Sequence, residues 1–177
     1  MSNLRLINQT EITSSISSIS IKDVFSDDFD IYKIIVNGMS TTGTTNTEVY
    51  FRFLNSAGGV IVTPNYQHAM ERMRSDTTVG SLNQTGQTSM RRLFGINTDQ
   101  APETQSGVAY VFNPSNTSTH SFVLAQSSTN FSSVHRNNKM IGVLPQASNV
   151  TGFNLFEVSS RPFNSGRIKT YGLRIDS

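Results

Sequence analysis

The feature of this sequence that most constrains its fold is an alternation of apolar and polar residues that recurs along most of the chain. In residues 49–54, Val49, Phe51 and Phe53 fall on one side of an extended segment and Arg52 falls on the other. Period-two patterning with β-branched and aromatic residues is typical of strands. The same kind of pattern returns in residues 16–21, 29–36, 107–112, 121–126, 140–144, 152–158 and 167–175. The sequence therefore predicts an all-β protein of roughly eight to ten short strands.

The stretch 26–54 is the richest in this pattern, and we expect it to form one long antiparallel hairpin. Its two apolar segments are separated by residues 38–47, which are polar after Met39 and read as a solvated loop. Side chains on the facing sides of the two strands should pack together. The residues predicted to form this buried cluster are Ile31, Ile35, Val49, Phe51 and Phe53.

The length of 177 residues suits one domain with a substantial core. Many short strands separated by turn residues favour a β-sandwich or a barrel. We predict a single-domain, jelly-roll-like β-sandwich, because both ends of the chain carry strand patterns and the first and last strands of that fold commonly lie near each other. Residues 1–15 are predicted to be an N-terminal arm or edge strand, and residues 16–177 the sandwich domain.

Residues 65–106 interrupt the strand pattern and are predicted to form a long excursion between two core strands. Residues 66–75 contain good helix formers, with Met70 and Met73 three positions apart, which predicts one short helix. Residues 77–105 are polar with isolated apolar side chains. Long irregular segments in compact domains are often binding loops.

Composition excludes several classes of protein. The chain has no cysteine, so it forms no disulfide and no thiolate metal site. Residues 1–11 lack the apolar stretch of a signal peptide, and no apolar run is long enough to insert into a membrane. The net charge of +2 is too small to indicate a specific nucleic-acid interface.

No motif points to catalysis. The chain contains three histidines, His68, His120 and His135. None of them has the spacing of a metal-ligand pair, and no serine lies in a nucleophile-elbow motif. The acidic residues Asp27, Asp28 and Asp30 lack the remainder of a calcium-binding loop. We expect no enzymatic activity, no catalytic residue, no bound metal and no cofactor.

Apolar residues and arginines outside the strand pattern are candidates for subunit contacts. Large apolar groups in such segments must fold back onto the sandwich or be covered by a neighbour. Arginine is enriched at protein interfaces, although a solvated basic loop is the plain alternative. The predicted contact residues are Leu4, Leu6, Ile7, Arg72, Arg74, Arg91, Arg92, Leu93 and Phe94.

Several stretches carry a resemblance to a known group of proteins. They are residues 4–15 (LRLINQTEITSS), 24–34 (VFSDDFDIYKI), 159–166 (SSRPFNSG) and 171–173 (YGL). Together they resemble small virion structural proteins, often described as tail-fibre-like, of marine tailed bacteriophages and of cyanophages in particular. The resemblance implies a structural component of the virion, made in the cytoplasm of the host bacterium, whose partners are other virion proteins.

The position in the particle stays open at this stage. The resemblance implies a compact module at an exposed position on the tail or fibre, which forms a homo-oligomer such as a trimer or ring. A host-surface glycan is a candidate partner for such a module. A capsid decoration, or cement, protein is the alternative within the same class. A carbohydrate-binding, lectin-like module is the alternative from a different class.

Overall fold

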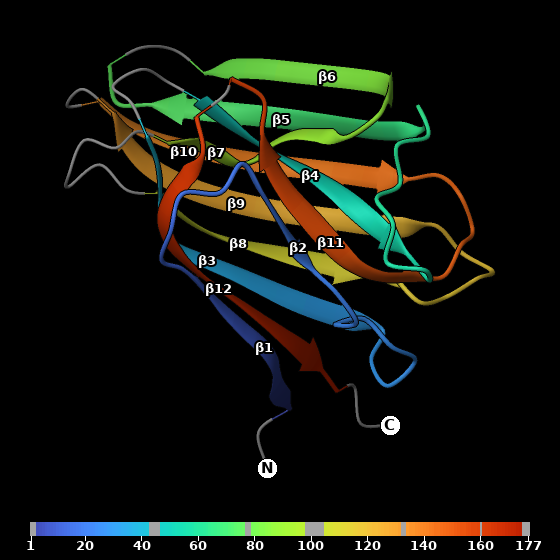
Figure 1. The fold of residues 1–177 in the computed structure, drawn as a ribbon. Coiled ribbons are helices and arrows are strands. Elements are labelled where there is room, and N and C mark those ends of the chain that lie inside the picture. Colours follow the sequence, from blue (N-terminus) through green and yellow to red (C-terminus); the bar gives the residue numbers. More distant parts are fainter. Residues whose placement is uncertain are drawn as a thin grey trace.

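The computed structural model describes residues 3–42, 47–76, 79–97, 105–131, 134–159 and 161–174. Strands make up 69% of the structure, and the described residues contain no helix, which confirms the all-β prediction (Figure 1). The strands are β1 (Leu4–Ile12), β2 (Ser18–Ile21), β3 (Ile31–Thr41), β4 (Thr47–Asn55), β5 (Tyr66–Arg74), β6 (Gly80–Gln87), β7 (Met90–Asn97), β8 (Gln105–Phe112), β9 (Ser121–Phe131), β10 (Val134–Leu144), β11 (Val150–Glu157) and β12 (Phe163–Leu173).

The strands form two antiparallel sheets of unequal size. The larger sheet has eight strands in the order β1-β12-β3-β8-β9-β10-β5-β6, and the smaller has four in the order β2-β11-β4-β7. The first and last strands are neighbours, because β1 pairs with β12 from Leu4 opposite Leu173 to Ile12 opposite Gly166. Of the two forms predicted for the N-terminal segment, the edge strand is the one observed.

One hydrophobic core lies between the two sheets. Tyr66 of the larger sheet stacks on Phe53 of the smaller sheet, with ring centroids 6.4 Å apart. The Tyr66 hydroxyl accepts a hydrogen bond from the Phe53 backbone N–H at 2.9 Å and donates one to the Ile61 carbonyl at 3.1 Å. Within the smaller sheet, Phe51 stacks on Phe153 at 5.7 Å. These contacts give the molecule a sandwich-like arrangement.

The predicted hairpin of residues 26–54 is wrong. Strands β3 and β4 follow each other in sequence but belong to different sheets, where β3 pairs with β12 and β8 while β4 pairs with β11 and β7. The connection between them therefore crosses from one sheet to the other. Apolar alternation marks a strand, but it does not identify the strand's partner.

The predicted buried cluster is correct for β4 and wrong for β3. Val49, Phe51 and Phe53 are fully buried, as predicted. Ile31 and Ile35 are only partly buried and lie on the face turned away from the core. The buried residues of β3 are Tyr32, Ile34 and Val36. Both faces of β3 are apolar, so alternation alone could not choose between them.

The predicted helix is also wrong. Residues 66–74 form β5, which pairs with β10 along most of its length. Tyr66, His68 and Met70 point to the core, whereas Gln67 and Glu71 are exposed, which is the period of a strand. Sheet pairing and burial override helix propensity here. The rest of the excursion contains β6 and β7 rather than an irregular loop.

Candidate functional site

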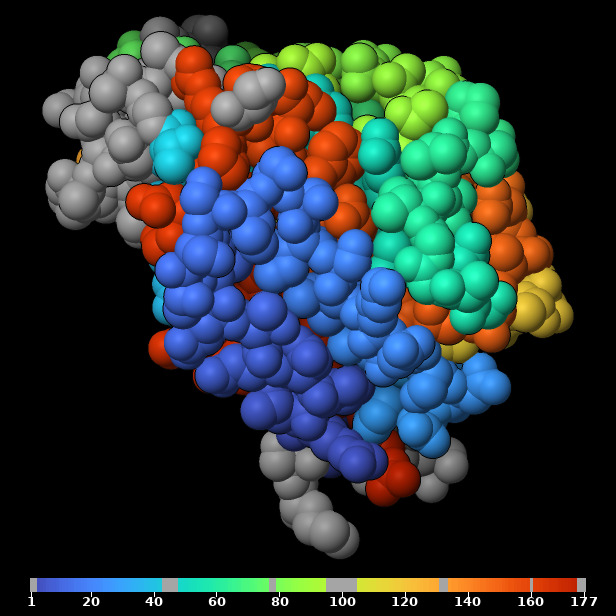
Figure 2. Space-filling view, in the orientation of Figure 1, coloured from blue at the N-terminus to red at the C-terminus, as the bar shows by residue number. Residues whose placement is uncertain are grey.

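The two faces of the larger sheet have different surroundings. The smaller sheet covers one of them, and Figure 2 views the molecule from that side, where the N-terminal segments in blue and the β11 region in orange close over the core. The opposite face, called here the outer face, is not covered by the smaller sheet. Its residues alternate with the buried ones along each strand, as in β9, where Val123 and Ala125 are buried and Phe122 and Leu124 are exposed.

Two rows of largely apolar side chains cross the outer face from β1 to β10. Direct cross-strand partners lie about 5 Å apart, so each row is continuous. The first row consists of Leu4, Leu173, Ile31, Phe112, Phe122 and Val143. The second consists of Leu6, Tyr171, Lys33, Tyr110, Leu124 and Ile141. These twelve residues are called the outer-face rows below.

Several members of the outer-face rows are strongly exposed. Ile141 is 58% exposed, Leu6 50% and Phe122 46%. Isolated apolar side chains at a surface are ordinary, but contiguous patches mark sites of interaction. Lys33 is the charged member of the rows, and its ammonium group lies 5.8 Å from the centre of the Tyr110 ring.

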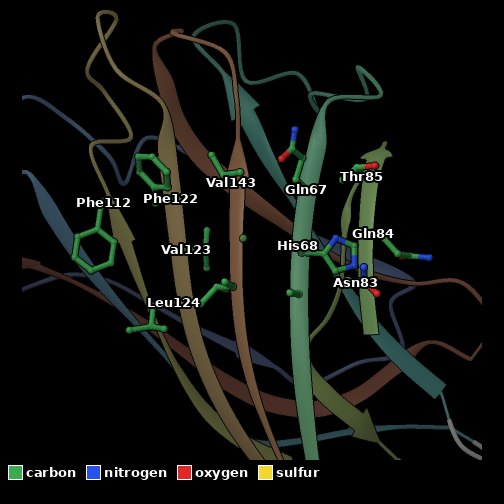
Figure 3. A pocket seen from close by; sticks show the side chains of 13 residues that line it. Gln67, His68, Asn83, Gln84, Thr85, Phe112, Phe122, Val123, Leu124 and Val143 are labelled. Carbon is green, nitrogen blue, oxygen red and sulfur yellow. The ribbon is translucent and has the colours of Figure 1, made fainter. Parts of the chain in front are cut away.

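One end of the outer-face rows is hollowed into a groove of about 610 Å³. Its apolar side is formed by Phe112, Phe122 and Leu124 on β8 and β9, together with Ile141 and Val143 on β10. Amide and hydroxyl groups from β5 and β6 lie along the other side, and Figure 3 shows Gln67, Asn83 and Thr85 there, across the groove from the two aromatic rings. An apolar wall facing a few polar groups is a usual composition for a binding site.

His68 lines the same groove but is held in the core. Desolvation by burial, and next the charge of Arg91, keeps the pKa of His68 below its usual value. Its Nε2 atom accepts a hydrogen bond from the Arg91 backbone N–H at 3.4 Å. Among the described residues, no group of three His, Asp or Glu side chains lies close enough to hold a metal ion.

A second polar site joins β4 and β7 around Glu48. Arg91 donates from Nη2 to Glu48 Oε1 at 3.0 Å, and Arg92 donates from Nε to the same oxygen at 2.6 Å. Burial opposes the charge on Glu48, but the hydrogen bonds and charges of the two arginines outweigh it and hold the pKa of Glu48 below its usual value. Arg91 and Arg92, which were predicted to contact another subunit, thus have an intramolecular partner in Glu48.

The β7 backbone is irregular at this point. Tyr50 is opposite Arg91 and Glu48 is opposite Ile96, so β7 carries extra residues between the two pairs. Arg92 has a φ of 62°, in the left-handed region that non-glycine residues rarely adopt. Consecutive residues of a regular strand point to opposite faces, and this bulge is what allows two neighbouring arginines to reach one carboxylate.

The predicted contact residues are scattered over the structure. Leu4 and Leu6 are exposed and begin the outer-face rows, while Ile7 is partly buried against the core. Leu93 and Phe94 are fully buried, because the β7 bulge directs both into the core. That placement corrects their assignment as surface contacts.

The arginines of β5 do not join Leu4 and Leu6 either. Arg72 and Arg74 lie on the inner side of the larger sheet, opposite Asn138 and Arg136 of β10. Sequence reasoning missed Phe122, Leu124 and Ile141, which form the groove end of the outer-face rows. The signal for them was present in strands with apolar residues at consecutive positions, such as 108–112 and 122–125.

The described residues include no helix that could span a membrane. In the comparisons with known proteins, no family model, no curated protein and no solved structure matches this chain.

Proposed function

We propose that this protein is a non-enzymatic structural component of a tailed-phage virion, and that further copies of the chain dock against its outer face. The observation that carries the proposal is the pair of outer-face rows, which leave a continuous apolar band across six strands of the larger sheet. The sequence resemblance described above supports the virion as the setting.

The chemistry of the rows favours a protein neighbour. Interface cores are depleted of charge and enriched in aromatic residues. The rows contain four aromatic residues, Phe112, Phe122, Tyr110 and Tyr171, with Lys33 as the charged member. A neighbour packed there would remove exposed apolar surface at roughly 25 cal/mol per Å². A homo-oligomer, as a trimer or ring, is the arrangement we favour.

The finer fold that suits this role is a jelly-roll-like sandwich. It is supported by two antiparallel sheets around one core and by the pairing of β1 with β12. Jelly rolls occur in viral capsid proteins and in lectins. A capsid decoration protein therefore stays the alternative to a module of the tail or fibre.

The docking proposal is tested by measuring the mass of the purified protein in solution, by analytical ultracentrifugation. We expect the purified protein to sediment as an oligomer and Ile141→Asp to sediment as a monomer, because the substitution places a charge at the most exposed of these apolar positions, on β10. Val158→Asp is the matched control, since Val158 is similarly exposed, at 53%, but follows β11 of the smaller sheet. A wild-type protein that stays monomeric at high concentration, or an Ile141→Asp oligomer of unchanged mass, would contradict the proposal.

The virion setting needs a separate test. Electron microscopy of purified phage particles, labelled with a gold-conjugated antibody against this protein, should place the label on the tail, the fibre or the capsid surface. Label on the capsid would establish the decoration role. Particles that carry no label would overturn the virion assignment.

The groove supports a second candidate, a carbohydrate-binding module. Sugars commonly stack on aromatic rings while their hydroxyl groups bond to amides, and this groove offers Phe112 and Phe122 opposite Gln67 and Asn83. A glycan array provides the test. Binding that is lost in Phe122→Ala and in Asn83→Ala favours this candidate, whereas an array without signal and an intact oligomer favour the docking role.

A further inference from the structure

Four arginines gather on the inner side of the larger sheet, at the ends of β5 and β10 and beside the β7 bulge. They are Arg72, Arg74, Arg92 and Arg136, called here the arginine cluster. Arg74 lies directly opposite Arg136, and like charges in directly opposed positions destabilise a sheet. Arg136 is only 7% exposed, so this repulsion is not relieved by full contact with water.

Two carboxylates among the described residues act on the cluster, and both have arginine partners already. Asp76 receives two hydrogen bonds from Arg74, at 2.8 and 2.7 Å. Glu48 receives hydrogen bonds from both Arg91 and Arg92. The Nε atom of Arg72 is buried and has no hydrogen-bond partner among the described residues. Among the described residues, the arginines here therefore outnumber the carboxylates.

A row of buried polar groups extends from Arg72 across the inner face. Arg72 is opposite Asn138, and Asn138 is opposite Ser127. Asn138 and Ser127 are almost fully buried, yet Asn138 Oδ1 and Ser127 Oγ have no hydrogen-bond partner among the described residues. Buried polar atoms are rarely left unsatisfied, and the Arg72 Nε–H and the Ser127 hydroxyl are donors that an acceptor group between the strands would satisfy. Asn138 Oδ1 is itself an acceptor, so the N–H side of that amide is the part that could serve such a group.

The backbone beside this row is in a costly conformation. A left-handed non-glycine residue such as Arg92 is energetically unfavourable and tends to be kept at functional sites. Here the conformation places the Arg92 side chain, which is 19% exposed, close to Arg72 and Arg136 of the same cluster and within reach of solvent. Charge, unsatisfied polar atoms and strain thus coincide.

We propose that the arginine cluster, with Asn138 and Ser127, is a binding site for an oxyanion, meaning a carboxylate, phosphate or sulfate group. Guanidinium groups bind such oxygens in pairs through parallel N–H donors, and the amide and hydroxyl groups supply further hydrogen bonds. The site lies on the inner face of the sheet, away from the outer-face rows. The oxyanion proposal is therefore independent of the proposed docking.

The test is a nuclear magnetic resonance titration of the ¹⁵N-labelled full chain with sodium sulfate, sodium phosphate or sodium acetate. Each is compared with sodium chloride at equal ionic strength, which separates binding from screening. We expect the Arg72 Nε–H and the Asn138 side-chain amide resonances to shift and saturate. Saturation by sulfate and phosphate alone would assign a tetrahedral group, and saturation by acetate would assign a carboxylate.

Two variants decide whether the cluster is responsible. Arg72→Gln should weaken binding, followed at the Asn138 amide, by about tenfold or more, because it removes charge-assisted hydrogen bonds. Arg167→Gln is the control, since Arg167 is exposed and pairs with Glu11 on the distant β1–β12 edge, and it should bind as the wild type does. If Arg72→Gln fails to fold, Arg72→Lys keeps the charge but not the paired donors, and should bind more weakly than the wild type.

Three results would overturn the proposal. The first is a response to all three anions that never saturates or that chloride reproduces. The second is unchanged affinity in the folded Arg72 variant. The third is the finding that ordered water contacts Asn138 and Ser127 whether or not an anion is present. Buried water alone would then satisfy the polar groups of the row.

Discussion

The two faces of the eight-stranded sheet resemble each other in composition and differ in what covers them. On β10, Met140 is 1% exposed on the inner face, and its neighbour Ile141 is 58% exposed on the outer face. On β3, Tyr32 and Ile34 are buried while Ile31 and Ile35 are only partly so. Apolar residues on a strand thus do not by themselves indicate the core of the chain. They lie either in the core between the sheets or on the uncovered outer face.

The comparison predicts opposite outcomes for one substitution on the two faces. Phe53→Ala should lower the free energy of unfolding by roughly 3–5 kcal/mol, because the ring is fully buried between Phe51 and Tyr66. Phe122→Ala, on the outer face, should change it by less than about 1 kcal/mol in dilute solution. Urea denaturation of the two variants measures both effects. Equal losses would mean that the outer face is buried in the isolated protein.

The hydrogen bonds of the Tyr66 hydroxyl, which connect the two sheets, should contribute less to the free energy of unfolding than the aromatic core does. Tyr66→Phe keeps the ring but removes the hydroxyl, leaving the Phe53 N–H and the Ile61 carbonyl without their partner. We expect a loss of roughly 1–3 kcal/mol in urea denaturation. Tyr110→Phe is the control on the outer face, where Tyr110 is only partly buried. A Tyr66→Phe variant as stable as the wild type would show that the bond across the sheets contributes nothing net.

Acid should lower the stability of the fold through two groups, His68 on β5 and Glu48 on β4. The pKa of His68 is lowered in the fold from 6.5, so neutral His68 stabilises the protein above that pH, and the contribution is lost as pH falls through the lowered value. Glu48 behaves likewise with respect to its ordinary 4.5. We expect the melting temperature to fall from pH 7 to pH 5 through His68, and further below pH 4.5 through Glu48.

Variants separate the two groups in that pH profile. His68→Gln should flatten the profile between pH 7 and pH 5 and leave the lower part intact. Glu48→Gln should remove the lower part. A profile that is the same in both variants as in the wild type would assign the acid sensitivity to other residues.

The smallest change in stability should come from Ile141→Thr. The side chain is mostly in water in the isolated chain, so we expect a change of less than about 0.5 kcal/mol in the free energy of unfolding. The same variant should weaken self-association, measured by sedimentation at several concentrations. Weaker association without a change in stability would separate the function of the outer face from that of the inner face.

Sequence reasoning was sound where a charged residue interrupts the apolar run of a strand. Arg52 lies between Phe51 and Phe53, and the buried face of β4 was predicted correctly. It failed for β3, whose two faces are equally apolar, and for residues 66–74, where helix-forming Met, Glu and Arg residues are held in a strand by pairing with β10. Partner strands and sheet membership depend on contacts distant in sequence, which alternation does not encode.

The candidate sites were less accessible from the sequence than the fold. Arg72, Arg74 and Arg92 were predicted as contact residues and Arg136 was missed, because their gathering depends on the register of β5 with β10 and on the left-handed backbone at Arg92. The outer-face rows come from six strands that span the chain from Leu4 to Leu173. No local motif could have brought those residues together.

The order of strands at one edge of the larger sheet has a consequence for how the chain folds during synthesis. Strand β12 lies between β1 and β3, and the Arg174 backbone N–H donates to the Asn3 carbonyl at 2.9 Å. Because the ribosome makes β12 after every other strand described here, β1 has no place in the sheet, and one edge of β3 stays open, until that strand emerges. Contacts of such large sequence separation close slowly. A nascent chain held before β12 would thus present an open strand edge to its neighbours, so chaperone occupancy should fall sharply once residues 163–173 leave the exit tunnel.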